Sequence, residues 1–540
     1  MKKIITIFII VHLYLIILDS QVKFQRAIGG TGRDIAYSIT QTTDGGYAVA
    51  GFTNSYGAGG YDMYIVKINN SGTVQWSKTI GGTNDDYAYS ITRTTDGGFV
   101  VGGSTASFGS GMYIVKLDPN GSPQWSKTVI GAYRPYSITQ TIDGGYVLGG
   151  TTSADYCIVK LNSSGTLIWS TTLEGPLAQT IPYNSMIQTI DGGIAFAGFT
   201  NRYGVWYEDY YVMKINSSGI YQWSRTVGGG GFDRAFSIIQ TTDSGFAMAG
   251  WSNTFGADIP NVYITKLNSN GTLQWGKIIV KYGEEGASSI IQTSDGGYVT
   301  AGYCINTSSD TNIYIVKLDG NANFQWGKSI GGTGGDFAYK VIETTDGGFA
   351  MAGYTKSFGA GNADMFIVKC DANGNTCGNS TSPSVYVSNV VGTLGTPSPI
   401  VTYPTFTINT SAPVINSGGI VTQICLAVNI RQNSEQVPSR TTLYQNYPNP
   451  FNPITKIKFD IPASPIPSKG GGQVVSLIIY DILGRKIASL LPPLGGGQEG
   501  LLSPGTYEVE FDGSNYPSGV YYYKLTAGEY SKARKLILLK

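Results

Sequence analysis

A triplet reading Asp-Gly-Gly, with one Asp-Ser-Gly variant, recurs seven times along the chain at intervals of 47 to 52 residues. A repeat of this length constrains the fold strongly, because each unit is one supersecondary motif that must bury its apolar face against its neighbours. The triplets begin at Asp44, Asp96, Asp143, Asp191, Asp243, Asp295 and Asp346.

Each repeat contains four strand-like segments, which in the first repeat read AYSITQTT, GYAVAGFT, MYIVKIN and TVQWSKTIGG. Asp-Gly and Ser-Gly turns join the segments, as in β-hairpins. Four short antiparallel strands in about 50 residues is the size of a β-propeller blade. The sequence therefore predicts an all-β fold with a seven-bladed β-propeller over residues 21–375. The content of 74 Gly and 37 Tyr, with only 13% charged residues, argues against long helices.

The phase of the repeat predicts how the propeller closes. The fourth segment carries a tryptophan, but only six are present for seven repeats, and the chain leaves the pattern after Cys370. Residues 23–30, KFQRAIGG, match the missing segment, with Phe24 at the tryptophan position. We therefore expect the N-terminal strand to complete the last blade and leave no free edge. The tryptophans are Trp76, Trp125, Trp169, Trp223, Trp275 and Trp326.

Regular recurrence indicates that the tryptophans pack between blades and do not form a binding site. A lysine recurs with them in each third segment. We expect these lysines to lay their aliphatic stems along neighbouring aromatic rings and to keep their ammonium groups in water. They are Lys67, Lys116, Lys160, Lys214, Lys266, Lys317 and Lys369.

Residues 1–20 have the pattern of a secretory signal peptide. Lys2 and Lys3 precede an apolar run of about 15 residues, shorter than the roughly 20 needed to span a bilayer. His12, the only histidine, lies in this run, so cleavage would remove every histidine-based nucleophile, general base and metal ligand. No other segment is long and apolar enough to be a transmembrane anchor. The 36 basic and 35 acidic residues nearly balance, so the sequence lacks the excess of positive charge that is typical of nucleic-acid-binding proteins.

Two Gly-rich loop types lie on one face of the predicted propeller, around the mouth of its central channel. Aspartates recur in both types, and two interpretations are open. Carboxylates in one ring can bind calcium, the only cofactor that the pattern suggests. Alternatively, each aspartate accepts backbone N–H bonds within its own loop. These residues are Asp34, Asp86, Asp233 and Asp336 in one type and Asp62, Asp155, Asp209 and Asp364 in the other.

Ligand-binding candidates lie where these loops depart from the repeat. Aromatic faces flanked by carboxylates and arginine suit stacking on sugar rings and recognition of hydroxyl groups, although drift in loop sequence also explains the departures. A glycosidase needs facing carboxylates, and adjacent residues on a strand point to opposite sides, so no catalytic residue is assigned. The candidates are Arg134, Glu174, Arg202, Trp206, Tyr207, Glu208, Glu284 and Glu285.

Residues 376–440 are rich in Ser, Thr, Pro, Asn and Val, which predicts an extended linker that can contain strands of its own. Cys370 and Cys377 are close enough in sequence for a loop-closing disulfide in an exported protein. Cys157 and Cys304 fall in strand patterns, so we expect buried thiols there.

Residues 441–540 have alternating apolar segments between Gly/Pro turns, which predicts a small β-sandwich. The segments YDILGRKI and SGVYYYKL and a basic Lys-Ala-Arg-Lys end follow a proline-rich motif. With these features the module resembles the C-terminal sorting domain of type IX (Por) secretion. Asn449 and Gly519 are expected in its turns. The motif consists of Tyr447, Pro448, Asn449, Pro450, Phe451, Asn452 and Pro453.

This resemblance implies a route and a partner. The signal would take the chain to the periplasm, and the sorting domain would engage the type IX machinery to cross the outer membrane, with the cargo then released or attached to the cell surface. The run YIVKL–NSSGT–W resembles blades of bacterial secreted β-propellers, including the pyrroloquinoline-quinone type, which implies a fold and no activity.

We therefore expect a secreted or cell-surface binding or adhesion protein whose propeller takes a glycan or a surface protein. The alternatives are a carbohydrate-active enzyme that uses channel-mouth carboxylates, and a purely structural surface module.

Overall fold

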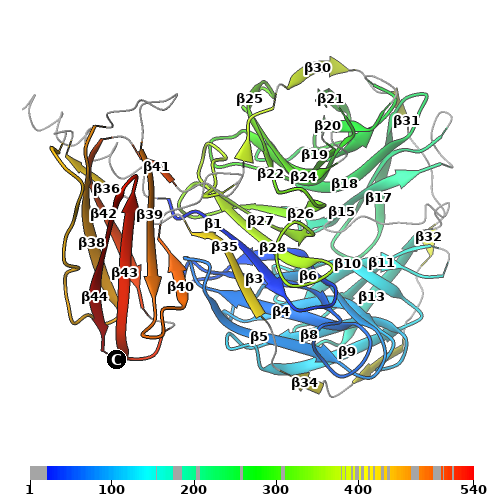
Figure 1. The fold of residues 1–540 in the computed structure, drawn as a ribbon. Helices are drawn as coiled ribbons and strands as arrows, with labels where there is room; N and C mark the ends of the chain where they lie inside the picture. The colour runs from blue at the N-terminus through cyan, green and yellow to red at the C-terminus, as the bar shows by residue number, and fades with distance from the viewer. Residues whose placement is uncertain are drawn as a thin grey trace, which may run out of the picture. The chain divides into compact units, whose positions relative to one another are not determined.

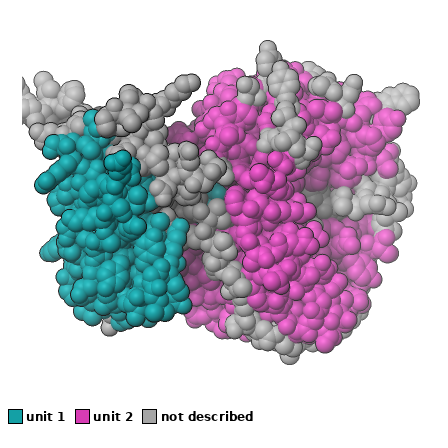
Figure 2. All heavy atoms as spheres, in the orientation of Figure 1, with its two compact units in different colours: residues 1–25, 376–379, 424–540 teal, residues 26–375, 380–423 magenta. Residues whose placement is uncertain are grey.

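A computed structural model gives the architecture (Figure 1). It describes residues 21–539 except 154, 174–184, 202–206, 256–258, 282, 306–309, 379, 384, 391–392, 396–400, 403–406, 411–413, 417–419, 427–430, 435–437, 464–472, 491–499, 503 and 514–515. The predicted signal peptide, residues 1–20, lies outside the described residues. The described chain is all-β and forms two compact units (Figure 2), which we call the seven-sheet unit (Arg26–Asn375 and Ser380–Gln423) and the C-terminal unit (chiefly Ile424–Lys540).

Each repeat forms one antiparallel sheet whose strands follow the order of the sequence. The first three sheets consist of β2 (Asp34–Gln41), β3 (Tyr47–Thr53), β4 (Asp62–Ile68) and β5 (Val74–Gly81); β6 (Asp86–Arg93), β7 (Phe99–Thr105), β8 (Gly111–Leu117) and β9 (Pro123–Ile130); and β10 (Tyr133–Gln140), β11 (Tyr146–Thr151), β12 (Tyr156–Leu161) and β13 (Leu167–Leu173).

The next three sheets consist of β14 (Met186–Gln188), β15 (Ile194–Thr200), β16 (Asp209–Ile215) and β17 (Tyr221–Gly228); β18 (Asp233–Gln240), β19 (Phe246–Ser252), β20 (Asn261–Leu267) and β21 (Leu273–Val280); and β22 (Glu285–Gln292), β23 (Tyr298–Ile305), β24 (Thr311–Leu318) and β25 (Phe324–Ile330). We call the first strand of each repeat its inner strand.

The seventh sheet takes its fourth strand from the other end of the chain. Its order is β26 (Asp336–Glu343), β27 (Phe349–Thr355), β28 (Asp364–Cys370) and then β1 (Phe24–Gly29). The predicted pairing of the N-terminal strand with the last repeat is therefore observed. Each sheet also contacts the next one in sequence order, and β2 of the first contacts β26 and β27 of the seventh.

Side-chain amides link the Asp-Gly-Gly turns of successive sheets. The amide oxygen of Gln140 accepts the backbone N–H of Thr95 at 2.8 Å, and the corresponding bond from Thr345 to Gln41, at 3.0 Å, joins the seventh sheet to the first. Five of the six repeated tryptophans each lie against an aromatic ring of the following sheet, with ring centroids 5.5 to 6.1 Å apart. These contacts agree with a packing role between sheets.

The segment suggested as a linker by its composition adds a fifth strand to each sheet, and we call these seven strands the belt. They join the sixth sheet first, continue down to the first sheet, and end on β1 of the seventh. The chain then passes into the C-terminal unit. The belt consists of β29 (Ser380–Thr381), β30 (Tyr386–Val390), β31 (Thr393–Gly395), β32 (Val401–Thr402), β33 (Thr407–Thr410), β34 (Val414–Asn416) and β35 (Ile420–Leu426).

The expectation for the seven repeated lysines was wrong. Their side chains are only 1 to 10% exposed, and each ammonium group pairs with the aspartate of its own Asp-Gly-Gly turn at 2.5 to 3.1 Å. The pairing brings together residues about 20 positions apart, because the turn and the lysine lie at the same ends of adjacent strands. Each lysine is therefore an internal counterion and not a solvated surface charge.

The disulfide suggested for Cys370 and Cys377 was also wrong. Cys370 is a free thiol at the end of β28 and is fully buried, whereas Cys377 is disulfide-bonded. Burial raises the pKa of Cys370 to about 12, so the thiol stays protonated. Cys157 and Cys304 are free and buried, as expected.

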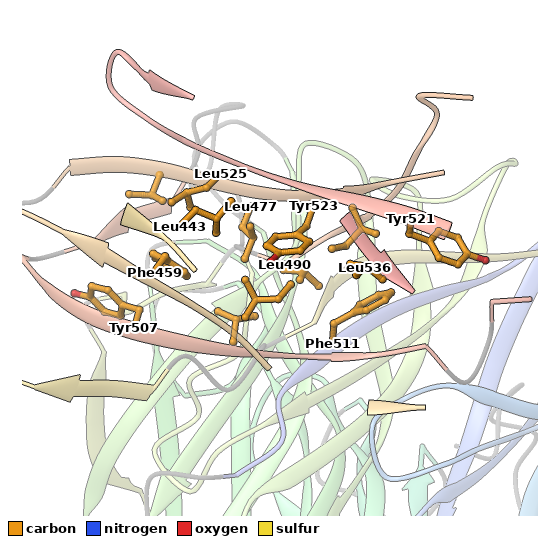
Figure 3. Packing of buried hydrophobic residues seen from close by; sticks show 14 of the residues in the cluster. Leu443, Phe459, Leu477, Leu490, Tyr507, Phe511, Tyr521, Tyr523, Leu525 and Leu536 are labelled. Carbon is orange, nitrogen blue, oxygen red and sulfur yellow. The ribbon is translucent and has the colours of Figure 1, made fainter. Parts of the chain in front are cut away.

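The C-terminal unit contains two facing sheets, ordered β36-β42-β38-β37 and β40-β39-β43-β44, with β41 paired to β39. Phe459, Tyr507 and Phe511 from the first sheet meet Leu477, Tyr523 and Leu536 from the second in one buried cluster (Figure 3). The strands are β36 (Arg431–Ser434), β37 (Thr442–Leu443), β38 (Ile454–Ile461), β39 (Gln473–Tyr480), β40 (Lys486–Ser489), β41 (Gly500–Leu502), β42 (Gly505–Asp512), β43 (Gly519–Ala527) and β44 (Tyr530–Leu538).

Candidate functional site

The repeated aspartates of the Gly-rich loops are engaged within those loops. Each of four accepts, through Oδ2, a backbone N–H from four residues earlier and the hydroxyl of a serine or threonine in the other loop, at 2.6 to 2.9 Å. These contacts support the second interpretation of the aspartates. Over the described residues, no three His, Cys, Asp or Glu side chains are grouped to hold a metal ion. The four are Asp34, Asp86, Asp233 and Asp336.

Glu285, proposed as a ligand-binding residue, lies at the position of these aspartates in the sixth sheet. It is fully buried, and its Oε2 accepts the backbone N–H of Lys281 at 3.3 Å. Burial raises the pKa of Glu285 to about 7. Glu285 is thus held inside its own loop and presents no exposed surface, whereas the sequence placed it among the ligand-binding candidates.

An arginine at the start of β18 forms the centre of the candidate site. The Arg234 guanidinium lies over three aromatic rings, 5.0 Å from Phe199, 5.9 Å from Phe232 and 5.1 Å from Trp251. Its Nε donates to Oε2 of Glu208 in a close ion pair, in which the arginine side chain is 34% exposed and the glutamate 14%. The arginine is thus fixed in orientation while about a third of its side chain remains open to solvent.

Tyr207 extends the aromatic surface of this site. Its ring lies 4.9 Å from that of Phe232, and the residue is 54% exposed. Tyr303, in the next sheet, stacks on Phe337 at 5.0 Å. Burial, followed by the charges of Glu284 and Glu285, raises the pKa of Tyr303 to about 12, and the Arg234 charge opposes the shift. The site therefore combines exposed aromatic faces with charges of both signs, and we call Tyr207, Glu208, Phe232, Arg234 and Trp251 the Arg234 site.

The other sequence candidates are distributed differently. Glu284 is exposed and influences Tyr303 electrostatically. Arg134 is exposed in the third sheet, with a backbone φ of 44°, and its Nη1 donates to the hydroxyl of Tyr136 at 3.5 Å. Glu174, Arg202 and Trp206 lie outside the described residues. The structure therefore brings Tyr207 and Glu208 together but does not add Arg134 to them.

Sequence reasoning missed Arg234, although a signal was present. Arg234 is the second residue of its inner strand, where other sheets have Ile35, Tyr87, Gly286 or Phe337. Arg134 occupies the same position in the third sheet and was selected because its loop is irregular. Arg234 was not selected as a ligand-binding candidate, because its own loop, GGGGFD, keeps the repeat pattern.

The proline-rich motif of the C-terminal unit connects its two sheets. Tyr447 exchanges backbone hydrogen bonds with Lys456 of β38, at 2.9 and 3.0 Å. Phe451 is buried, donates its N–H to the carbonyl of Ile537 in β44, and lies 5.9 Å from the Phe511 ring of β42. The peptide bonds before Pro448 and Pro450 are cis. The motif is thus a structural strap that leaves Tyr447 81% exposed.

The side chain of Asn449 joins this strap to β44. Its Oδ1 accepts the N–H of Ile537 at 2.9 Å, and its Nδ2 donates to the carbonyl of Lys535 at 3.3 Å. Gly519 differs from its expected place in a turn, because it is the first residue of β43 and pairs with Leu538.

Comparisons with known proteins bear mainly on the C-terminal unit. No curated protein matches the chain. Similar solved structures include a protein of unknown function from Dyadobacter fermentans, with 11% identity and a TM-score of 0.40 over 65% of this chain and 99% of that one. Sqt1 from Chaetomium thermophilum has 13% identity and a TM-score of 0.40 over 62% and 82% of the two chains. No helix in the described ranges is long and apolar enough to cross a membrane. Residues 445–539 match the family described as the secretion system C-terminal sorting domain. This domain marks the protein as one exported by type IX secretion to the cell surface or the extracellular space.

Proposed function

We propose that this exported protein is a seven-bladed β-propeller that binds a glycan on its loop face through the Arg234 site. The propeller assignment is supported by seven sheets of the same strand order, each in contact with the next, and by the contacts of β2 with β26 and β27. The C-terminal sorting domain delivers the propeller through the type IX machinery. The glycan proposal is a separate step and depends on the chemistry of the site.

The observation that carries the binding proposal is the fixed, partly exposed Arg234. Its Nε is engaged by Glu208, and in the described part of the chain no other hydrogen bond of its guanidinium is found, so the Nη groups are available as donors. The Tyr207 ring offers an apolar face beside them. Pyranose rings present an apolar C–H face and a rim of hydroxyl groups, so they match an aromatic face next to a charged donor and a carboxylate acceptor.

The alternative of a carbohydrate-active enzyme receives less support. Glycoside hydrolysis requires two carboxyl groups on opposite sides of the scissile bond. Of the described candidates, Glu285 is fully buried and Glu208 is ion-paired with Arg234, so only Glu284 is exposed. One exposed carboxyl group does not supply the facing pair that hydrolysis needs.

The test is a glycan array with the full-length protein, followed by calorimetric titration of the strongest oligosaccharide. We expect Arg234→Met and Tyr207→Ala each to weaken binding at least tenfold. Arg134→Met is the matched control, because it removes an arginine at the same repeat position outside the Arg234 site, and its effect should stay within twofold. The absence of any bound glycan, or full binding by Arg234→Met, would contradict the proposal.

A further inference from the structure

At one position of the inner strands, a single sheet carries a different residue from the six others. A β-bulge precedes this position in six of the sheets. Six sheets have a serine there, whereas the seventh has Lys340. The serines are Ser38, Ser90, Ser137, Ser185, Ser237 and Ser289.

Lys340 lines an open cavity of about 510 Å³ whose wall is formed by the inner strands of all seven sheets. The rest of the lining consists of isoleucine, serine and threonine with Met186, Gln140 and Gln188, so Lys340 is the only charged residue among the described residues that line it. In four sheets a tyrosine immediately precedes this position, and each ring contacts the next, with centroids 4.8 to 5.6 Å apart. In order of contact they are Tyr339, Tyr37, Tyr89 and Tyr136. The cavity thus has an apolar wall with hydroxyl groups and a single cation.

Lys340 differs from the seven repeated lysines because no carboxylate faces it. Its ammonium group has no hydrogen bond or ion pair among the described residues, and burial alone lowers the pKa of Lys340 to about 8. On the preceding sheet, Oγ of Ser289 also lacks a hydrogen bond in the described structure, but this serine is fully buried and does not line the cavity. By contrast, Oγ of Ser90 and of Ser237 accepts a backbone N–H from the following sheet, at 3.3 and 3.2 Å.

We propose that this cavity binds a small organic monocarboxylate, with its carboxylate on the Lys340 ammonium group and its alkyl part among the isoleucines. The half-buried Lys340 cation is neutralised by one negative charge, whereas a phosphate dianion would leave a net charge inside the cavity, which is costly. The apolar wall, which includes Ile39, Ile91 and Ile290, favours an aliphatic body. A volume of about 510 Å³ is within the range of small-molecule sites.

The probe is hexanoate, titrated calorimetrically into the full-length protein at pH 7, with hexanamide as its uncharged analogue. Isoleucine methyl NMR spectra locate the bound probe. The decisive variant is Lys340→Ser, which installs the residue that the six other sheets have and so is expected to fold. Lys340→Arg keeps the charge.

We expect hexanoate to bind and to shift the cavity isoleucine methyl signals. Hexanamide should bind at least tenfold more weakly, Lys340→Ser should weaken hexanoate binding at least tenfold, and Lys340→Arg should retain part of it. The inference is overturned if no alkanoate from acetate to octanoate binds, or if hexanamide binds as well as hexanoate. The second comparison uses the unmodified protein, so it decides the question even if Lys340→Ser misfolds. Arg234→Met should leave hexanoate binding intact, which separates this inference from the glycan proposal.

Discussion

Two sets of aspartates at opposite ends of the strands have opposite electrostatics. Those of the Asp-Gly-Gly turns are 38 to 59% exposed and pair with buried lysines, and the pKa of five of them is lowered to about 2. Their desolvation is outweighed by hydrogen bonds to the lysine, to a threonine and to a backbone N–H. The five are Asp44, Asp96, Asp143, Asp243 and Asp295.

Two aspartates of the Gly-rich loops, Asp62 and Asp86, are buried, and neither forms an ion pair with a cation among the described residues. Burial, with the nearby charge of Asp86 as a further cause, raises the pKa of Asp62 to about 6. Oδ1 of both carboxylates is buried and has no donor within the described structure. The two groups meet beside Gly81, where a Cβ would collide with both of them. The same residue type, in the same repeat, is thus an ion-pair partner at one end and a costly buried group at the other.

The largest expected effect of this difference is on the pH dependence of stability. The turn aspartates have folded-state pKa values below those of the unfolded chain, so their stabilisation is complete above about pH 4 and is lost as the pH falls toward about 2. Asp62 and Glu285 have raised folded-state pKa values, so the folded state binds more protons and gains stability as the pH falls from about 7 to about 4. Urea unfolding from pH 2 to 8 should therefore give a maximum near pH 4 to 5. A maximum in the free energy of unfolding above pH 7 would contradict the opposite signs of these two sets of pKa shifts.

A smaller effect is expected from neutralising one turn aspartate. Asp96→Asn keeps the oxygen that accepts the Gly98 N–H but removes the counterion of Lys116, whose side chain is 4% exposed. Breaking a fully buried pair costs about 3–5 kcal/mol, and the half-exposed aspartate and the remaining bond from Lys116 to the Leu117 carbonyl reduce this to about 2 kcal/mol. Urea denaturation at pH 7 measures the change. An unchanged midpoint would show that the lysine does not depend on its counterion.

The smallest effect should have the opposite sign. Asp62→Asn installs the residue that Asn261 and Asn312 already provide at the same repeat position. At pH 7 it removes a buried charge that lacks a cation, so we expect a gain of about 1 kcal/mol in the free energy of unfolding. The gain should disappear near pH 4, where Asp62 is protonated in the folded state. A loss of stability at pH 7 would indicate that the carboxylate has a partner, such as a bound cation.

Periodic features of the molecule could be predicted from the sequence. The Asp-Gly-Gly spacing located the hairpins, and the single missing tryptophan segment indicated that Phe24 and its neighbours pair with the last repeat. The lysine–aspartate pairs were harder to predict, because a lysine beside aromatic residues fits a solvated surface equally well. Arg234 was missed because its environment depends on Glu208, Phe199 and Trp251, which belong to other segments of the chain.

The belt could not have been predicted from apolar alternation. Most of its strands have two to five residues, which is too short for a period of two to be recognised. Such segments become strands because the outer edge of each sheet offers unpaired backbone N–H and carbonyl groups. Their conformation is therefore set by the partner strand, which sequence periodicity does not describe.

The order in which the belt joins the sheets determines when the last sheet can be completed. The belt follows the seventh repeat in the chain and pairs with the sheets from the sixth down to the first, before β35 pairs with β1. The first described strand therefore lies between β28 and β35, two strands that are synthesised after most of the seven-sheet unit. A chain that emerges from one end can complete its seventh sheet only when both ends of this unit are present together.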